Sequence, residues 1–330
     1  MDVLKSCPEQ RTLEDAIEKL AKGEKELPRA YEATMRRING QGKSDADLAR
    51  RVLAWIVFGK RRLPLTVLRH ALSVRRGDNQ LVASGIPSVE MILSVCAGLV
   101  VKLDGPRSTL LDPDSTLSKS TLDLAHKTAR EYIEGQVDQF VDASGYLMTT
   151  CFTYLSFDIF ATGPSTELLN PRRFDRLYQY AAKYGGCHAR DMKLYTEDEM
   201  RLIMAFLEHQ SLVAACVQVA FSGESYMGIT GLFLAVHFEL YDISKALLDR
   251  GSHPDPKTSR GETPLLWAAE EGHDRIVELL IQTGKVGLNA KDYTHGWTPL
   301  AVAAVQGHEV VVKRLLATEA VDPNSTDIDG

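Results

Sequence analysis

The sequence predicts a mostly α-helical protein whose last third is a solenoid of helix-pair repeats. Two observations carry this prediction. The tripeptide Thr-Pro-Leu stands at 263–265 and again thirty-five residues later at 298–300, with matching residues in step around both copies. Elsewhere apolar residues recur at helical spacing, as in the segment 200–207, and only two short runs of β-type residues interrupt this pattern.

The chain opens with a helical lead-in. Thr12 and Asp15 have the spacing of a capping box, which predicts a helix start near that point. The apolar residues of 31–38 then recur at helical spacing, and a polar break follows at 39–45.

The next segment has the order of a winged helix, which is three helices followed by a two-stranded hairpin. Three amphipathic helices are expected first, and the second and third are expected to begin near Pro64 and Pro87. The β-type runs are 99–103 and 121–125. A further helix is expected at 127–134.

The chain then becomes helical again. Pro171 is expected to begin a helix that Gly185 and Gly186 stop. Thr196 and Glu199 form a capping box ahead of the next helix. No linker rich in proline and glycine separates these helices from the repeats, so we expect one continuous solenoid-like body.

Each residue of the repeated motif has a structural role. Thr263 and Thr298 are expected to cap an inner helix, with proline at its first position, where a missing N–H costs nothing. A weaker copy begins at Thr230. The pattern resembles the ankyrin repeat, which implies binding rather than catalysis. Trp267 occupies a core position of that pattern, whereas Trp297 precedes its Thr-Pro-Leu on the hairpin side and is harder to assign to the core.

These observations predict four segments. In chain order they are a helical lead-in at 1–44, a winged helix at 45–135, a helical connector at 136–225, and about three ankyrin repeats, the last one uncapped, at 226–330.

A wider resemblance covers most of the chain. The segments at 27–134, 174–190 and 230–236 resemble the region that follows the NACHT ATPase in fungal NLR-like (STAND-class) proteins, which contains a winged helix of the GPI inositol-deacylase type. In that family the NACHT module binds and hydrolyses nucleotide, the winged helix holds it shut, and the repeats sense a ligand or partner. The resemblance therefore implies a regulatory role in signalling.

The chain departs from this family because the NACHT module is absent. It begins where that module would end, and at 327–330 it stops where a further repeat would start. We therefore expect a short gene, a truncated isoform or a fragment. His126 matches a family position whose imidazole contacts the β-phosphate of ADP, so it is a candidate nucleotide-sensing residue if a NACHT module is supplied in trans. The favoured alternative is a histidine bonded to backbone at a strand-to-helix junction.

Bulk composition fits a soluble globular protein. The net charge of −6 gives no general case for binding nucleic acid or acidic membranes. Five widely spaced cysteines without any Cys-x-x-Cys argue against a disulfide framework or zinc site. The sequence shows neither a signal peptide nor a membrane span, so we expect a cytoplasmic protein without membrane contact.

No motif in the chain predicts catalysis, a cofactor or a metal. Gly42, Lys43 and Ser44 end a P-loop pattern, but the first glycine of that pattern is Arg37 and no strand precedes the site. His308 begins a zinc-protease motif that lacks its second histidine. DNA binding is also disfavoured, because the third helix of the winged-helix segment has no arginine or lysine to read bases.

We therefore expect a non-catalytic scaffold that binds a protein partner through the concave face of its ankyrin repeats. A DNA-associated regulator and a degenerate gene fragment are the alternatives. Trp297 and Tyr293 are the expected anchors, because a large aromatic in this row has no core to fill, and Arg260 is expected to orient an acidic or aromatic partner. The expected contact residues are Arg260, Glu262, Glu270, Glu271, Tyr293, His295, Trp297, Val305 and Gln306.

Overall fold

The computed structural model describes residues 27–104, 120–136, 140, 142–165, 176–221 and 227–328. They form two compact units. One unit holds the described residues up to Arg75 and from Leu81 to Thr150, and the other holds Arg76–Gln80 and the described residues from Cys151 onward. The expected capping box at Thr12 and the expected helix start at Pro171 lie outside the described residues. The four predicted segment boundaries are not decided by this division and stay predictions.

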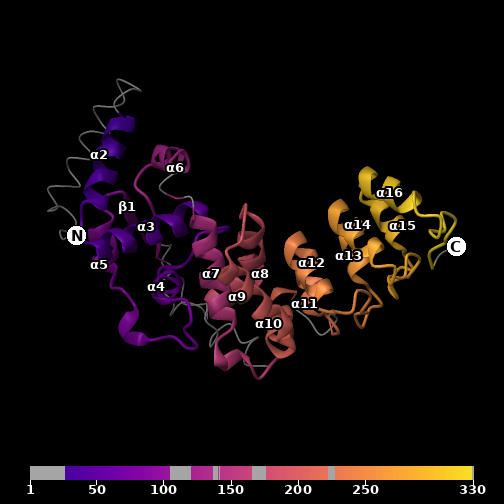
Figure 1. The fold of residues 1–330 in the computed structure, drawn as a ribbon. Coiled ribbons are helices and arrows are strands. Elements are labelled where there is room, and N and C mark those ends of the chain that lie inside the picture. The colour runs from indigo at the N-terminus through magenta and orange to yellow at the C-terminus, as the bar shows by residue number, and fades with distance from the viewer. Residues whose placement is uncertain are drawn as a thin grey trace, which may run out of the picture. The chain divides into compact units, whose positions relative to one another are not determined.

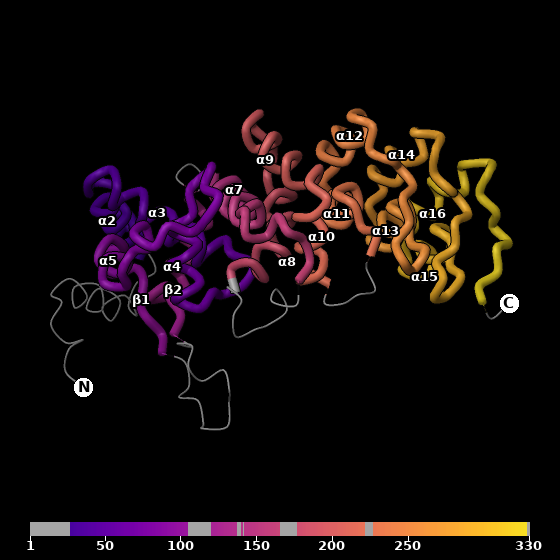
Figure 2. Tube along the Cα trace, turned by 90° about the horizontal axis from the view of Figure 1, so that it is seen from below, coloured from indigo at the N-terminus to yellow at the C-terminus, as the bar shows by residue number. Residues whose placement is uncertain are grey.

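The first unit combines helices with one small sheet. Its elements are α2 (Leu27–Asn39), α3 (Lys43–Phe58), α4 (Leu65–Ser73), the 3-10 helix η1 (Ala83–Gly85), α5 (Val89–Val95), β1 (Val100–Leu103), β2 (Thr121–Leu124) and α6 (Lys127–Glu134). Helix α7 (Ala143–Leu155) leads the chain from this unit into the second. Three helices, a hairpin and a closing helix is the order expected from the sequence. The two strands pair antiparallel (Figure 2), with Val100 opposite Leu124.

Helix α3 lies at the centre of the first unit. Its apolar stripe is fully buried at Val52 and Leu53, and it contacts α2, α4, α5, α6 and β2. The Arg130 guanidinium donates to the carbonyls of Ile56 and Val57, at 2.9 and 2.6 Å, and so satisfies groups at the end of α3 that have no partner within the helix. An arginine on α6 therefore closes the carboxyl end of α3.

The second unit is helical in all its described parts. Its elements are η3 (Asp158–Phe160), α8 (Arg176–Arg190), α9 (Glu197–Glu208), α10 (Gln210–Ala220), α11 (Gly231–His237), α12 (Tyr241–Asp249), α13 (Pro264–Glu270), α14 (Asp274–Gln282), α15 (Pro299–Val305) and α16 (Glu309–Leu316). No single described helix has the length and apolarity needed to cross a membrane, and α9 and α10 meet that test only as a pair bent by 83°.

Two glycines that were expected to end a helix instead lie inside one. Helix α8 continues through Gly185 and Gly186 to Arg190, so this prediction is wrong. A Cβ on Gly186 would lie 2.1 Å from the ring of Phe238, and one on Gly185 would lie 3.2 Å from Cys151. The glycines are present because neighbouring groups pack directly against the helix backbone there, which a side chain would prevent.

The last six helices form three pairs. The inner helices α11, α13 and α15 follow one another in one layer, and the outer helices α12, α14 and α16 follow in a second (Figures 1 and 2). The predicted caps are confirmed, because the Thr263 and Thr298 hydroxyls each accept a backbone N–H at 3.2 Å. Thr230 makes no such bond, which fits its weaker copy of the motif.

Trp267 fills the core between the first and second pairs. It is 6% exposed, and its ring packs against those of Phe221, Phe233 and His237. The prediction of a packing role for this tryptophan is confirmed.

The third pair leaves more apolar surface open than the second. In α16, Val312 is half-buried and Leu316 is 50% exposed, whereas their counterparts in α14, Val277 and Ile281, are fully buried and half-buried. In a stacked array each repeat gains stability from its neighbours, so a pair with less buried surface opens more readily.

We predict that backbone amides of 296–316 exchange with deuterium faster than those of 261–284. Hydrogen exchange followed by mass spectrometry would measure this directly. Appending a designed capping repeat after residue 328 should slow the exchange of 296–316. Equal protection of the two segments in the unmodified chain would contradict the prediction.

Candidate partner-binding groove

A groove of about 280 Å³ opens beside the second and third helix pairs. Its floor is formed by apolar side chains of the inner helices, namely Leu266, Trp267 and Val302. Its rim carries six of the contact residues expected from the sequence. These are Arg260, Glu262, Glu270, Glu271, His295 and Trp297. The structure therefore brings together, in one hollow, residues that the sequence placed in one row.

The other expected contact residues do not line this groove. Tyr293, Val305 and Gln306 are exposed outside it. Tyr293 is 69% exposed, yet its ring also covers the neighbouring hairpin, since a Cβ on Gly261 would lie 2.7 Å from that ring. Its backbone N–H donates to the Arg260 carbonyl at 2.8 Å. Tyr293 thus combines an exposed face with a packing role between hairpins.

The hairpin that carries Trp297 is organised by a single carboxylate. Asp292 accepts the backbone N–H groups of Thr294 and His295, both at 2.7 Å, and of Trp297 at 2.9 Å. Burial would raise the pKa of Asp292, but these three donors outweigh it and hold the pKa below its ordinary value of 3.8. The carboxylate is therefore ionised at neutral pH and fixes the loop geometry. Asp292 is not among the residues expected from the sequence, although aspartate is a common residue at loops of this kind.

Two rings on this hairpin form an aromatic wall. His295 and Trp297 stack with centroids 4.6 Å apart and an interplanar angle of 24°. Trp297 is half-buried, so its indole is supported by the hairpin while part of it stays open to the groove. A ring held in this way loses little conformational freedom when a partner binds.

The acidic residues of the groove influence one another. Burial, and then the nearby carboxylates of Glu271, Glu262 and Asp292, raise the pKa of Glu270 above its ordinary value of 4.5, with Arg260 opposing them. Glu271 behaves in the opposite way, because the His237 imidazole, 3.6 Å away, holds the pKa of that carboxyl below 4.5. The ionised form of Glu270 is therefore disfavoured by its surroundings.

Arg260 contacts one residue of its own hairpin and one of the next hairpin. Its Nε lies 4.0 Å from Glu262, and its Nη2 lies 3.5 Å from the Thr294 hydroxyl. Four carboxylates and one guanidinium line the groove, so acidic charge predominates even with this arginine included. The expectation that Arg260 orients an acidic or aromatic partner stays a prediction.

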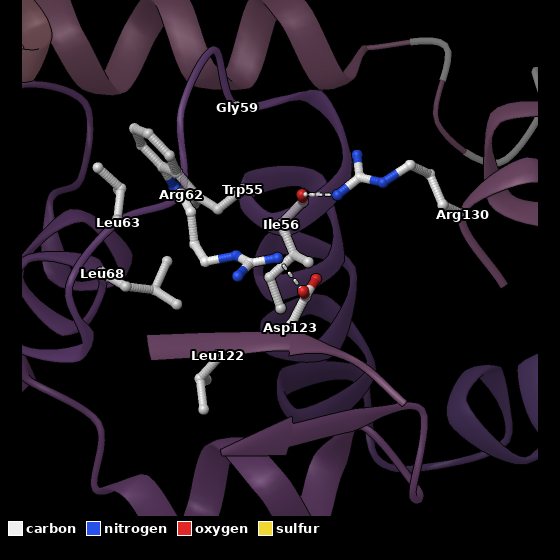
Figure 3. A pocket seen from close by; sticks show the side chains of 9 residues that line it. All are labelled: Trp55, Ile56, Gly59, Arg62, Leu63, Leu68, Leu122, Asp123 and Arg130. Atoms are coloured by element: carbon white, nitrogen blue, oxygen red, sulfur yellow. Dashed lines mark hydrogen bonds and ion pairs between the residues drawn. The ribbon is translucent and has the colours of Figure 1, made fainter. Parts of the chain in front are cut away.

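A second cavity, of about 270 Å³, lies in the first unit between α3, the hairpin and α6 (Figure 3). Its charged groups already have partners: the Arg62 guanidinium contacts Asp123, and Arg130 donates to the end of α3. The Trp55 indole N–H donates to the Tyr146 hydroxyl at 3.2 Å. These bonds join elements of the fold, and we assign the cavity a structural role.

His126 caps helix α6. Its Nδ1 accepts the Thr128 backbone N–H at 3.3 Å and lies 2.7 Å from the Thr128 hydroxyl, which in turn contacts the Tyr31 hydroxyl. This is the backbone-bonded junction histidine that the sequence analysis favoured over a nucleotide sensor. Lys43, the lysine of the incomplete P-loop pattern, is the first residue of α3. Within the described ranges, no group of three or more His, Cys, Asp or Glu residues is arranged to hold a metal ion.

Comparison with protein families identifies residues 232–327 as three copies of the ankyrin repeat. No curated protein matches the chain. Ankyrin repeats are generally non-catalytic modules that bind other proteins, and every residue that lines the groove except Phe221 lies within the three copies. The match stops short of the first unit, so the NACHT-associated context stays a prediction.

Replacing Glu270 with glutamine should stabilise the fold at neutral pH. Because the folded-state pKa of Glu270 is raised, its ionised form is penalised above that pKa, and the penalty disappears once the carboxyl is protonated below about its ordinary pKa. Because the side chain is exposed and solvent screens the repulsion, Glu270→Gln should raise the free energy of unfolding at pH 7 by only about 0.2–0.5 kcal/mol, with no gain at pH 4. Urea unfolding at both pH values measures this.

Glu319→Gln provides a matched control, because Glu319 is exposed and lies outside the groove. It removes the same formal charge and should leave stability nearly unchanged. Destabilisation by Glu270→Gln at pH 7 would show that the carboxylate holds the fold together instead of straining it.

Proposed function

We propose that this protein is a non-catalytic scaffold that holds a protein partner in the groove of its ankyrin repeats, with Trp297 at the centre of the contact. The observation that carries the proposal is the half-buried indole of Trp297, which opens into the groove from a hairpin fixed by Asp292. Tryptophan dominates binding hot spots when it is rigid and partly desolvated. The groove has an apolar floor and a polar rim, and protein interfaces usually have an apolar centre surrounded by polar residues.

The wider context that we propose is regulation of an NLR-like signalling ATPase in the cytoplasm, with the NACHT module as a partner supplied in trans. Two observations support it. The sequence resemblance spans 27–330, and the first unit has three helices, a hairpin and a closing helix in the order of that family's winged helix. The alternative of a DNA-associated regulator has less support, since α5 exposes Glu90 and Met91 rather than basic residues.

The Trp297→Ala variant tests the binding site. Tagged wild-type and variant proteins would be used to capture partners from the source organism, and the captured proteins would be quantified by mass spectrometry. A partner of the groove should bind the variant at least tenfold more weakly, because removal of a hot-spot tryptophan costs about 2 kcal/mol or more. The melting temperature should stay nearly unchanged, since alanine keeps the backbone N–H through which Asp292 holds the hairpin.

Tyr241→Ala is the control for loss of an aromatic ring. Tyr241 lies on the outer helix α12 and packs beneath the Arg275 guanidinium, away from the groove. Capture by this variant should match the wild type. If Trp297→Ala melts early and keeps its affinity per folded molecule, Trp297 is a packing residue and the proposed site is wrong.

A further inference from the structure

Glu270 stands apart from the other carboxylates of the groove. Asp292 accepts three backbone N–H groups, Glu262 accepts the Thr258 hydroxyl at 3.1 Å, and Glu271 lies beside His237. Within the described part of the chain, by contrast, no donor reaches the Glu270 carboxylate. The Glu270 side chain is exposed, so its carboxylate is free to accept charge-assisted hydrogen bonds from a cation.

The groove around Glu270 combines negative charge with an aromatic face. Its lining holds four carboxylates against one guanidinium, and that guanidinium already contacts Glu262. The open part of the Trp297 indole borders the same hollow. A tryptophan ring attracts a cation placed over its face, and Coulomb attraction strengthens in a partly desolvated groove.

We propose that the groove receives an arginine or lysine side chain from a basic segment of the partner protein. The charged head lies between Glu270 and Glu271, and the side chain runs along the indole of Trp297. This inference rests on the proposed function and specifies the chemistry of the partner at that site.

Other occupants fit the groove less well. An acidic segment would meet four carboxylates, and an apolar side chain would bury the Glu270 carboxylate without a partner. The volume of about 280 Å³ lies just below the range of about 300–1,000 Å³ that is usual for pockets holding a whole small molecule. It suits one long side chain delivered by a larger partner.

Short charged peptides provide the test. Fluorescein-labelled tetra-arginine and tetra-lysine would be titrated with the full chain in 150 mM salt and followed by fluorescence anisotropy, with tetra-glutamate as the peptide of opposite charge. The wild type should bind at least one of the two basic peptides and should not bind tetra-glutamate. Glu270→Gln should weaken that binding at least fivefold, and Trp297→Ala should weaken it as well.

Glu319→Gln separates a specific site from general attraction to an acidic chain. It removes the same charge as Glu270→Gln from an exposed position outside the groove, so the affinity should stay within twofold of the wild type. Equal losses in the two variants would overturn the proposal, and so would failure of the wild type to bind either basic peptide. Thermal melts of each variant show that the comparison is made between folded proteins.

Failure of this inference is distinguishable from failure of the proposed function. A natural partner that needs Trp297 but is indifferent to Glu270→Gln would overturn the basic-segment proposal and leave the groove as the binding site. Capture that is indifferent to Trp297→Ala would overturn the proposed site itself.

Discussion

The alignment of each repeat against the one before it is the constraint on which the rest of the binding surface depends. Each outer helix of the second and third repeats is preceded by a histidine whose Nε2 contacts the repeat before it. His273 reaches the carbonyl of His237 at 3.4 Å, and His308 reaches that of Glu270 at 2.8 Å. Each bond connects the end of the inner helix of one repeat to the start of the outer helix of the following repeat. The inner helices can approach closely because small residues, such as the fully buried Ala268 and Ala269, face their neighbours. The groove is a consequence of this spacing.

The same alignment places acidic side chains where they repel one another. The backbone of Glu270 takes part in holding the repeats together, while its side chain stands near three other carboxylates at the rim. Sites that are strained in the free protein are frequently those that bind something, because the partner relieves the strain. The lost stability and the binding capacity of Glu270 are two results of one arrangement.

Much of the fold follows from local sequence signals, whereas the site follows from them only in part. Threonine-proline pairs gave the starts of the inner helices, and the Thr196 capping box is present as predicted, because these signals act within one turn of helix. Gly185 and Gly186 misled the prediction, since a glycine pair marks either a helix end or a close contact, and only the position of Phe238 distinguishes them. The row of contact residues was predictable from the repeat pattern. The role of Asp292 and the opposite pKa shifts of Glu270 and Glu271 could not be predicted, because they depend on side chains from different repeats.

The ionisation of Glu270 itself tests the central claim most directly. Carbon-13 NMR of the side-chain carboxyl would be followed through a pH titration, first on the free protein and then in the presence of saturating tetra-arginine. The account predicts a pKa above 4.5 for Glu270 in the free protein and a lower pKa when the peptide is bound, because a cation favours the ionised form. A pKa at or below 4.5 in the free protein, or one that saturating peptide leaves unchanged, would contradict it.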